Sequence, residues 1–557
     1  MGKFLNSMNY DIIMKKLLAI LMAGIFLLPS NMVFSKNTQH YDYVIITTDK
    51  LADSLTNFTE WKESLGYSIK IVTISWIESN YNGKDIQEKI RNFLIDKYEE
   101  WGIDYVLIVG SRDKIPMRDC YPLYNHHEND YMVPTDYYYA DLNGNWDADK
   151  DGYYGEYLQD KPDFYPEVYV GRIPSDDANK VESICQHIIN FEKSNETWKK
   201  SVLLLAPVLF YENYTNQWGK WHRSDGATLM EECWNDIFKP NGFSAIKMYE
   251  KEGIRPSTYA CDYKLNHSNV LAEWKKHGII NMVGHSSFLS VYRCVWASDD
   301  GDKIPEDNEL KFYLFIGHVD APKLSMDKPP IVFSGGCDQL YRSRNMGRIF
   351  MEDGAACAFI GATGMSWYNV SRAWNSEKDG GGLSIDYYFF HYLINENQKI
   401  GNALYNAKVY YYNHFGFPIT FKEWSDRILR FYVNLYAFNL YGDPSLGINT
   451  KITDSNPPTI NIEKPKNHLY VSNKEILPTP FPIIIGGITI DANAIDENGI
   501  KKVEFYVDNH LKESMESKPY SWMWNEFVIG MHKIKVVCYD NADNIAGDEE
   551  KVLIFNI

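Results

Sequence analysis

The chain contains 557 residues, of which 56 are basic and 74 acidic, so its formal net charge is −18. This acidic balance argues against nucleic acid as a partner, because phosphate binding depends on clustered Lys and Arg side chains. The length exceeds what one hydrophobic core usually serves, so we expect at least two domains. The eight cysteines include no CxxC pair, which excludes zinc-ribbon and haem-attachment sites by spacing.

The N-terminus has the pattern of a secretory signal peptide. Lys15 and Lys16 precede an unbroken apolar run over 17–28, and a short stretch ending at Ser35 offers small residues for cleavage. The run is shorter than the roughly 20 apolar residues that span a bilayer. We therefore predict a signal peptide over residues 1–35 and a secreted, extracellular protein without a membrane span.

The segment 36–175 alternates short apolar runs with amphipathic stretches, which predicts a first α/β subdomain. The expected strands and helices, in chain order, lie at 43–47, 51–65, 68–74, 85–98 and 105–109. Strand and helix alternate along this segment, and such an order is typical of a parallel sheet with helices on both faces.

The same rhythm continues over 176–452, which predicts a second α/β subdomain. Its expected strands lie at 201–206, 245–249, 279–283, 331–334 and 356–361, and its last helices at 400–415 and 423–436. Right-handed crossover connections would make these strands parallel.

Beyond residue 453 the helical periodicity disappears. Short alternating runs at 459–462, 503–507 and 533–539 are separated by Asn- and Asp-rich turns. This pattern predicts a C-terminal, all-β immunoglobulin-like sandwich over residues 453–557.

Two predicted strand ends in the second subdomain carry reactive side chains. His285 follows the strand at 279–283, and Cys337 follows the strand at 331–334 after two glycines. Functional groups gather at the carboxyl ends of strands in open α/β sheets, and an adjacent imidazole activates a thiol. Each residue alone is more often structural. Together, about 50 residues apart in His-then-Cys order, they fit a caspase-type catalytic pair.

An ordered series of motifs resembles the gingipain family of cysteine peptidases, over roughly residues 41–446. The motifs lie at 104–110, 135–141, 166–174, 284–287, Cys337 and 440–446. The resemblance implies a caspase-like α/β fold, with a parallel sheet flanked by helices. It also implies that Cys337 is the nucleophile, that His285 is the general base, and that the backbone N–H groups of Ser286 and Cys337 form the oxyanion hole.

The resemblance further suggests residues around the catalytic pair. Glu212 is the nearest acid after the strand that would precede a third catalytic carboxylate. Asp225 and Trp367 resemble residues of the family's primary specificity pocket, which implies a preference for a basic P1 side chain. Asp225 fits the N-cap of the following helix equally well.

An acidic loop predicts a structural calcium site. Its candidate ligands are Asp147, Asp149, Asp151 and Glu156. Alternating carboxylates followed by Gly152 bring oxygen atoms together as in an EF-hand loop, although the closing acid is not at the twelfth position. The family resemblance adds Asp136 and Glu167 as possible ligands. A solvated Asp-Gly turn is the alternative.

These features predict a secreted cysteine endopeptidase that hydrolyses proteins or peptides through a thioester. The alternative is a secreted adhesion or scaffold protein built on an inactive peptidase domain. In either case the C-terminal sandwich is available to bind a surface or another protein.

Overall fold

The computed structural model describes residues 40–122, 132–216, 219–368, 375, 381–415, 424–449, 457–496, 499–516, 518–540 and 544–556. The predicted signal peptide therefore lies outside the described residues. Within the described ranges, no helix combines the length and the apolar character needed to cross a bilayer.

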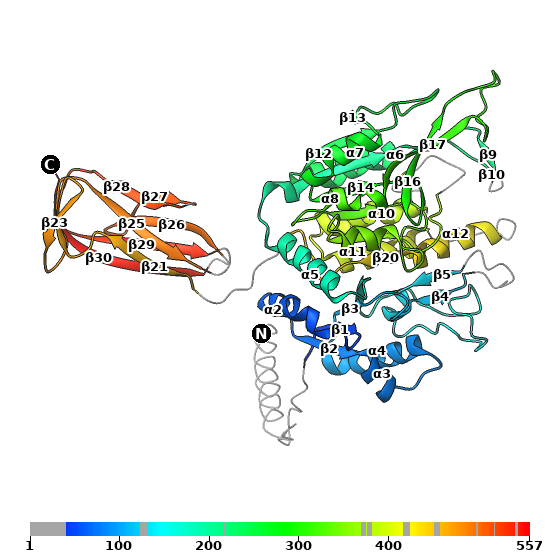
Figure 1. The fold of residues 1–557 in the computed structure, drawn as a ribbon, viewed down its shortest axis with the longest axis horizontal. Helices are drawn as coiled ribbons and strands as arrows, with labels where there is room; N and C mark the ends of the chain where they lie inside the picture. Colours follow the sequence, from blue (N-terminus) through cyan, green and yellow to red (C-terminus); the bar gives the residue numbers. More distant parts are fainter. Residues whose placement is uncertain are drawn as a thin grey trace, which may run out of the picture. The chain divides into compact units, whose positions relative to one another are not determined.

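The larger, α/β part of the chain is organised around one mixed sheet of eleven strands (Figure 1). In spatial order the strands are β13 (Tyr263–Lys264), β12 (Ser244–Tyr249), β7 (Ser201–Ala206), β14 (Ile279–Met282), β18 (Ile331–Ser334), β19 (Ala358–Ala362), β20 (Phe438–Tyr441), β6 (Tyr169–Ile173), β3 (Tyr105–Val109), β1 (Tyr43–Thr47) and β2 (Ile69–Thr73). The predicted α/β fold is confirmed, and most strand bounds agree with the prediction to within two residues.

Every neighbouring pair in this sheet is parallel except β19 and β20, which are antiparallel. The sheet therefore consists of two parallel halves that run in opposite directions and join at this pair. The two expected α/β subdomains share this continuous sheet, and β20 from the second segment lies beside β6 of the first.

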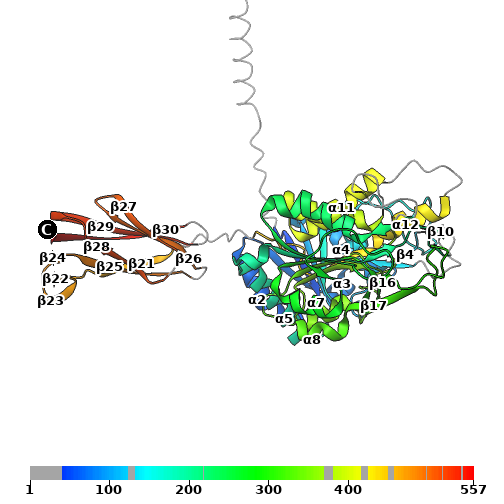
Figure 2. The same ribbon diagram turned by 90° about the horizontal axis from the view of Figure 1, so that it is seen from above.

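Helices cover both faces of the sheet (Figure 2). The longer helices are α2 (Thr56–Ser64), α4 (Ile86–Trp101), α5 (Ala178–Lys193), α6 (Gly226–Cys233), α10 (Gly382–Phe390), α11 (Ile400–Phe415) and α12 (Trp424–Ala437). Figure 2 shows α11 on one face and α5 on the other. Because both faces are covered, the central strands are continuous apolar runs with every residue buried, as in β1, β18 and β19.

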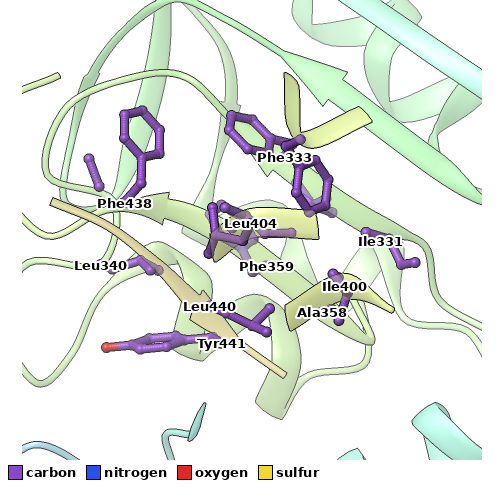
Figure 3. Close-up of a cluster of buried hydrophobic side chains, with 14 of the residues drawn as sticks. Ile331, Phe333, Leu340, Ala358, Phe359, Ile400, Leu404, Phe438, Leu440 and Tyr441 are labelled. Carbon is purple, nitrogen blue, oxygen red and sulfur yellow. The ribbon is translucent and has the colours of Figure 1, made fainter. Parts of the chain in front are cut away.

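The junction of the two halves lies in the hydrophobic core (Figure 3). The rings of Phe333 on β18 and Phe438 on β20 stack with centroids 5.7 Å apart. Phe359 and Leu440 from the antiparallel pair are also buried there. Aromatic and branched side chains therefore fix the place where the strand direction reverses.

A small antiparallel sheet, which the sequence did not predict, lies beyond the end of β14. It comprises β15 (His285–Ser287), β16 (Ser290–Trp296) and β17 (Leu310–Gly317). A short pair, β8 (Val208–Phe210) with β11 (Ser224–Asp225), packs beside it, where Val208 and Tyr211 contact Trp296 in a separate apolar cluster. These strands position the segments that surround His285.

The C-terminal part is all-β, as predicted. One sheet has the strands β21 (Thr459–Lys464), β25 (Ile488–Ile495) and β28 (Tyr520–Trp524). The other has β23 (Lys474–Pro478), β22 (His468–Val471), β24 (Ile483–Ile485), β30 (Ile545–Asn556), β29 (Val528–Asp540), β26 (Ile500–Val507) and β27 (His510–Met515). The buried residues of the two sheets form a separate core that includes Trp524 and Phe505.

Candidate active site

The expected neighbours in the sheet, β14 and β18, are paired in parallel, with Met282 opposite Ser334. His285 and Cys337 each follow three residues beyond this last matched pair. Both side chains line one cavity with a volume of about 270 Å³. The strand pairing that the sequence predicted therefore brings the imidazole and the thiol to the same edge of the sheet.

A close crossing of two chain segments fixes the backbone around the thiol. Ser286 Oγ donates a hydrogen bond of 2.7 Å to the carbonyl of Cys337. A Cβ atom on Gly336 would clash with Ser286 Oγ and lie 3.0 Å from the carbonyl oxygen of Gly284. Glycine is required at 336 because no side chain fits between these segments. The serine beside His285 thus supports the backbone of Cys337.

The imidazole of His285 is held by a backbone carbonyl. Its Nε2 lies 2.7 Å from the carbonyl oxygen of Leu209. Since a carbonyl only accepts, Nε2 carries the proton and Nδ1 is left with a lone pair. The rings of Phe210 and Phe312 meet the imidazole edge-on, at centroid distances of 5.1 and 5.2 Å. Burial lowers the pKa of His285 below its ordinary value, and the hydrogen bond to Leu209 only partly opposes this, so the ring is neutral.

The thiol of Cys337 is also neutral at rest, because burial raises its pKa to about 12. Its Sγ contacts the backbone of Ser366, 3.4 Å from the nitrogen and 3.7 Å from the oxygen. Asp338, the next residue, has a left-handed backbone with φ of 62°. Among the described residues, no hydrogen bond joins the thiol to His285, and none occupies the backbone N–H of Cys337.

Glu212 does not contact the imidazole, contrary to its expected role as a third catalytic group. Its carboxylate accepts a hydrogen bond of 2.8 Å from the backbone N–H of Arg223 and lies 3.5 Å from His222. The group that orients His285 is the Leu209 carbonyl. Sequence reasoning missed it because a main-chain carbonyl carries no residue-type signal. The only signal in the sequence was position: Leu209 lies between the predicted strand at 201–206 and Glu212, the expected acid.

Asp225 does not line the cavity. Its Oδ1 accepts a hydrogen bond of 3.2 Å from the backbone N–H of Ala227, so it is the N-cap of α6, as the alternative interpretation predicted. Its Oδ2 lies 3.2 Å from the guanidinium of Arg223. Both carboxylate oxygens of Asp225 therefore have partners within the protein, and its role in a specificity pocket stays a prediction. Trp367, in contrast, does line the cavity.

The remaining wall of the cavity is mainly apolar and aromatic. The described residues that line it are Leu209, Phe210, Tyr211, Tyr214, Asn216, Trp221, Gly284, His285, Cys294, Leu310, Phe312, Cys337, Met365, Ser366, Trp367 and Tyr368.

Three of the predicted calcium ligands lie together. Asp147, Asp149 and Asp151 each offer a carboxylate oxygen, and these oxygens lie within 4.8 Å of one another. That spread fits the shell of a cation with ligand distances of about 2.3–2.6 Å. Burial, followed by the charges of Asp151 and other nearby acids, raises the pKa of Glu156 to about 8. Lys84 compensates part of the negative charge of this cluster, with its Nζ 2.6 Å from Asp147.

The other two expected ligands lie outside this group. Asp136 is buried and accepts two hydrogen bonds from the guanidinium of Arg172, at 2.6 and 2.8 Å. Glu167 accepts hydrogen bonds of 2.6 Å from the backbone of Leu142 and the side chain of Asn143. Their carboxylates hold the polypeptide together, so the acid cluster is smaller than the sequence suggested.

The fold and the two residues at the paired strand ends match the arrangement expected for a cysteine-type peptidase. Residues 36–449 match the model of peptidase family C25, and residues 458–536 match a bacterial Ig domain. The chain belongs to peptidase family C25. A search of curated proteins gave no match.

Solved structures agree on the fold. The Arg-specific cysteine proteinase gingipain R is similar over 93% of this chain and 99% of its own, with 14% identity and a TM-score of 0.51. A complex of the pro- and mature domains of RgpB from Porphyromonas gingivalis gives 92% and 99% coverage, 14% identity and a TM-score of 0.51. A third structure, described only as a protease, gives 93% and 98% coverage, 13% identity and a TM-score of 0.50.

Proposed function

We propose that this protein is a secreted cysteine endopeptidase that hydrolyses peptide bonds through a thioester on Cys337. The observation that carries the proposal is the position of His285 and Cys337 on adjacent strand ends, facing one cavity. Membership of peptidase family C25 supports the reaction class. The N-terminal basic and apolar pattern supports export.

The proposed reaction begins with a neutral thiol and a neutral imidazole. Nδ1 of His285 takes the thiol proton while Sγ of Cys337 attacks the peptide carbonyl carbon. The backbone N–H groups of Ser286 and Cys337 donate to the developing oxyanion. Collapse of the tetrahedral intermediate releases the amine, which receives the proton from His285. Water, deprotonated by the same imidazole, then hydrolyses the thioester.

The hydrogen bond to Leu209 gives the imidazole a fixed tautomer throughout this cycle. When His285 accepts the proton, the imidazolium donates more strongly through Nε2 to the carbonyl. This arrangement performs the orienting task of a catalytic carboxylate without a buried negative charge.

We further propose that Asp147, Asp149 and Asp151 hold a structural calcium ion, with Glu156 close by. Their oxygen atoms fit a hard cation. When bound, calcium would neutralise the crowded carboxylates and fix the loop. No step of peptide hydrolysis is routed through it.

Replacing Cys337 by Ala tests the main proposal. Cys337→Ala and His285→Ala should each abolish hydrolysis of a fluorogenic peptide library while the circular dichroism spectrum stays unchanged. Cys261→Ala, which also removes a half-buried thiol, is the matched control and should retain full activity. Unchanged hydrolysis by Cys337→Ala contradicts the proposal, and an inactive wild-type protein favours the scaffold alternative.

A further inference from the structure

The cavity beside Cys337 has an unusual composition for a pocket that would bind a basic side chain. Among its described lining residues there is no carboxylate, and its only ionisable base is the neutral His285. Four of the aromatic residues in its wall, Phe210, Trp221, Trp367 and Tyr368, belong to three separate stretches of chain. The wall is therefore assembled by the fold and is not a single hydrophobic loop.

The aromatic wall is held rigidly. Phe210 and Trp221 stack in parallel with centroids 3.4 Å apart. Trp221 Nε1 donates a hydrogen bond of 3.0 Å to Asn216 Oδ1, and Tyr368 donates one of 2.7 Å to the carbonyl of Gly335. These bonds satisfy the polar groups of Trp221 and Tyr368, so these two rings present apolar surfaces to the pocket. Because this apolar wall is already ordered, binding a substrate side chain does not carry the entropy cost of ordering it.

The carboxylate that the sequence predicted as the counter-charge for a basic substrate already has two partners. Asp225 caps α6 and is paired with Arg223, and it does not line the cavity. A guanidinium or ammonium group that entered would lose its water without gaining a carboxylate partner, which is strongly unfavourable. An apolar side chain that entered would gain from leaving water.

We propose that the pocket beside Cys337 binds a large apolar or aromatic P1 side chain, such as Phe, Tyr, Leu or Met, and disfavours Arg and Lys. The inference rests on the proposed peptidase function and specifies its substrate class. The volume of about 270 Å³ accommodates one such side chain. The enzyme would then differ in specificity from the Arg-specific gingipain R whose fold it shares.

A panel of peptidyl coumarin amides that differ only at P1 tests this inference. These substrates have no amino acid after the cleaved bond, so any preference belongs to P1. The kcat/KM values for Phe and Leu should exceed those for Arg and Lys by about 10- to 100-fold. A preference for Arg or Lys, with activity lost in Cys337→Ala, overturns the inference and leaves the peptidase function intact. Absence of hydrolysis at every P1 residue instead contradicts the peptidase function.

Asn216→Asp provides an independent test. Asn216 lines the cavity, and Asp at this position keeps an oxygen acceptor for Trp221 while adding a negative charge. The ratio of kcat/KM for Arg to that for Phe should rise by about tenfold. The matched control is Asn213→Asp, which adds the same charge nearby but outside the cavity lining and should leave the ratio unchanged. An unchanged ratio in Asn216→Asp contradicts the inference, and the wild-type panel decides the question if this variant does not fold.

Discussion

The imidazole of His285 makes its only hydrogen bond within the described residues to the main chain of Leu209. A carboxylate in that place would stabilise the imidazolium and raise the pKa of His285, whereas a carbonyl dipole contributes less. Burial dominates, and the pKa falls below 6.5. Burial also keeps the Cys337 thiol protonated, so the resting enzyme holds a neutral pair and not a thiolate–imidazolium pair.

The pH dependence of hydrolysis should reflect this neutral pair. The imidazole accepts a proton only when it is neutral, so kcat/KM should fall as the pH decreases through the pKa of His285, with a midpoint below 6.5. No rise from thiolate formation should be seen up to pH 9, because the pKa of Cys337 is about 12. A pH–rate profile with a stable fluorogenic peptide measures both features. An acidic midpoint at or above 6.5 would show that another group sets the protonation state.

The crossing of Gly336 and Ser286 can be tested with a double-mutant cycle. Gly336→Ala should reduce kcat/KM by more than about tenfold, because its Cβ clashes with Ser286 Oγ and displaces the nucleophile's backbone. Ser286→Gly removes the clashing hydroxyl and should cost about 1 kcal/mol of stability through its lost hydrogen bond. The double variant should recover part of the activity, but not all, since the Gly284 carbonyl remains 3.0 Å from the new Cβ. Strictly additive losses would contradict a direct clash.

At this scale the sequence predicted the residues whose chemistry depends on side-chain type. The placement of His285 and Cys337 in one cavity was predictable because a thiol and an imidazole each followed a predicted strand, and their catalytic roles stay a proposal. The role of Leu209 was not recognisable in the same way, and for Asp225 the sequence left two roles open. One acts through its main chain, and the other has a carboxylate that serves as a helix cap or as a charge partner according to its neighbours.

Among the elements, the acidic loop that holds Asp147, Asp149 and Asp151 is where the proposed calcium ion can be tested. Millimolar calcium should raise the melting temperature, and EGTA should lower it and expose the loop to proteolysis. The combined Asp149→Asn and Asp151→Asn variant should lose this response. The combined Glu60→Gln and Glu63→Gln variant, at two exposed positions of α2, is a control of equal charge change. Identical melting of the wild type with calcium and with EGTA would show that the loop is a solvated turn.

Glu156 gives the calcium prediction a second readout. Without a cation its pKa in the folded state is about 8, above the ordinary 4.5. The folded state therefore binds more protons than the unfolded state between these values, and stability should decrease as the pH rises across that interval. Bound calcium would favour the carboxylate and flatten the dependence. Thermal melts from pH 5 to pH 8, with calcium and with EGTA, measure the difference.

The regular elements were mostly predictable because their apolar patterns are long and clear. The buried strands β1 and β18 and the helix α11 have the bounds that the sequence predicted. The strand β20 was missed, because only four residues separate the end of α12 from the loop that follows. The hairpin of β15 and β16 was missed because its first strand is a polar His-Ser-Ser segment.

In the whole molecule, a buried ionic cluster ties distant parts of the peptidase chain together. Lys62 on α2 lies 2.7 Å from Glu192 on α5 and 2.5 Å from Asp443 after β20, and all three side chains are fully buried. Tyr43 donates a further hydrogen bond of 2.7 Å to Asp443. The two carboxylates share one ammonium group, so the cluster depends on Lys62.

Lys62→Met should therefore destabilise the protein strongly. Removing one partner of a buried ion pair costs about 3–5 kcal/mol, because the remaining charge is left without compensation. The control Lys276→Met removes the exposed partner of Glu273 and should cost no more than about 1 kcal/mol. Urea unfolding monitored by tryptophan fluorescence measures both values. If Lys62→Met unfolds within 1 kcal/mol of the wild type, the cluster contributes little to stability.

The position of β20 in the large sheet affects how the peptidase domain can fold during synthesis. This strand is among the last elements of the peptidase domain to be synthesised, yet it lies between β19 and β6, with Tyr441 paired to Arg172. While the chain is still emerging, β6 has a neighbour on one side only, and its free edge can pair with other chains. A product that ends before residue 438 would therefore consist of two unjoined half-sheets with open edges. We expect such a fragment to aggregate during biosynthesis. The sheet of the peptidase domain is therefore completed only when β20 pairs with β19 and β6.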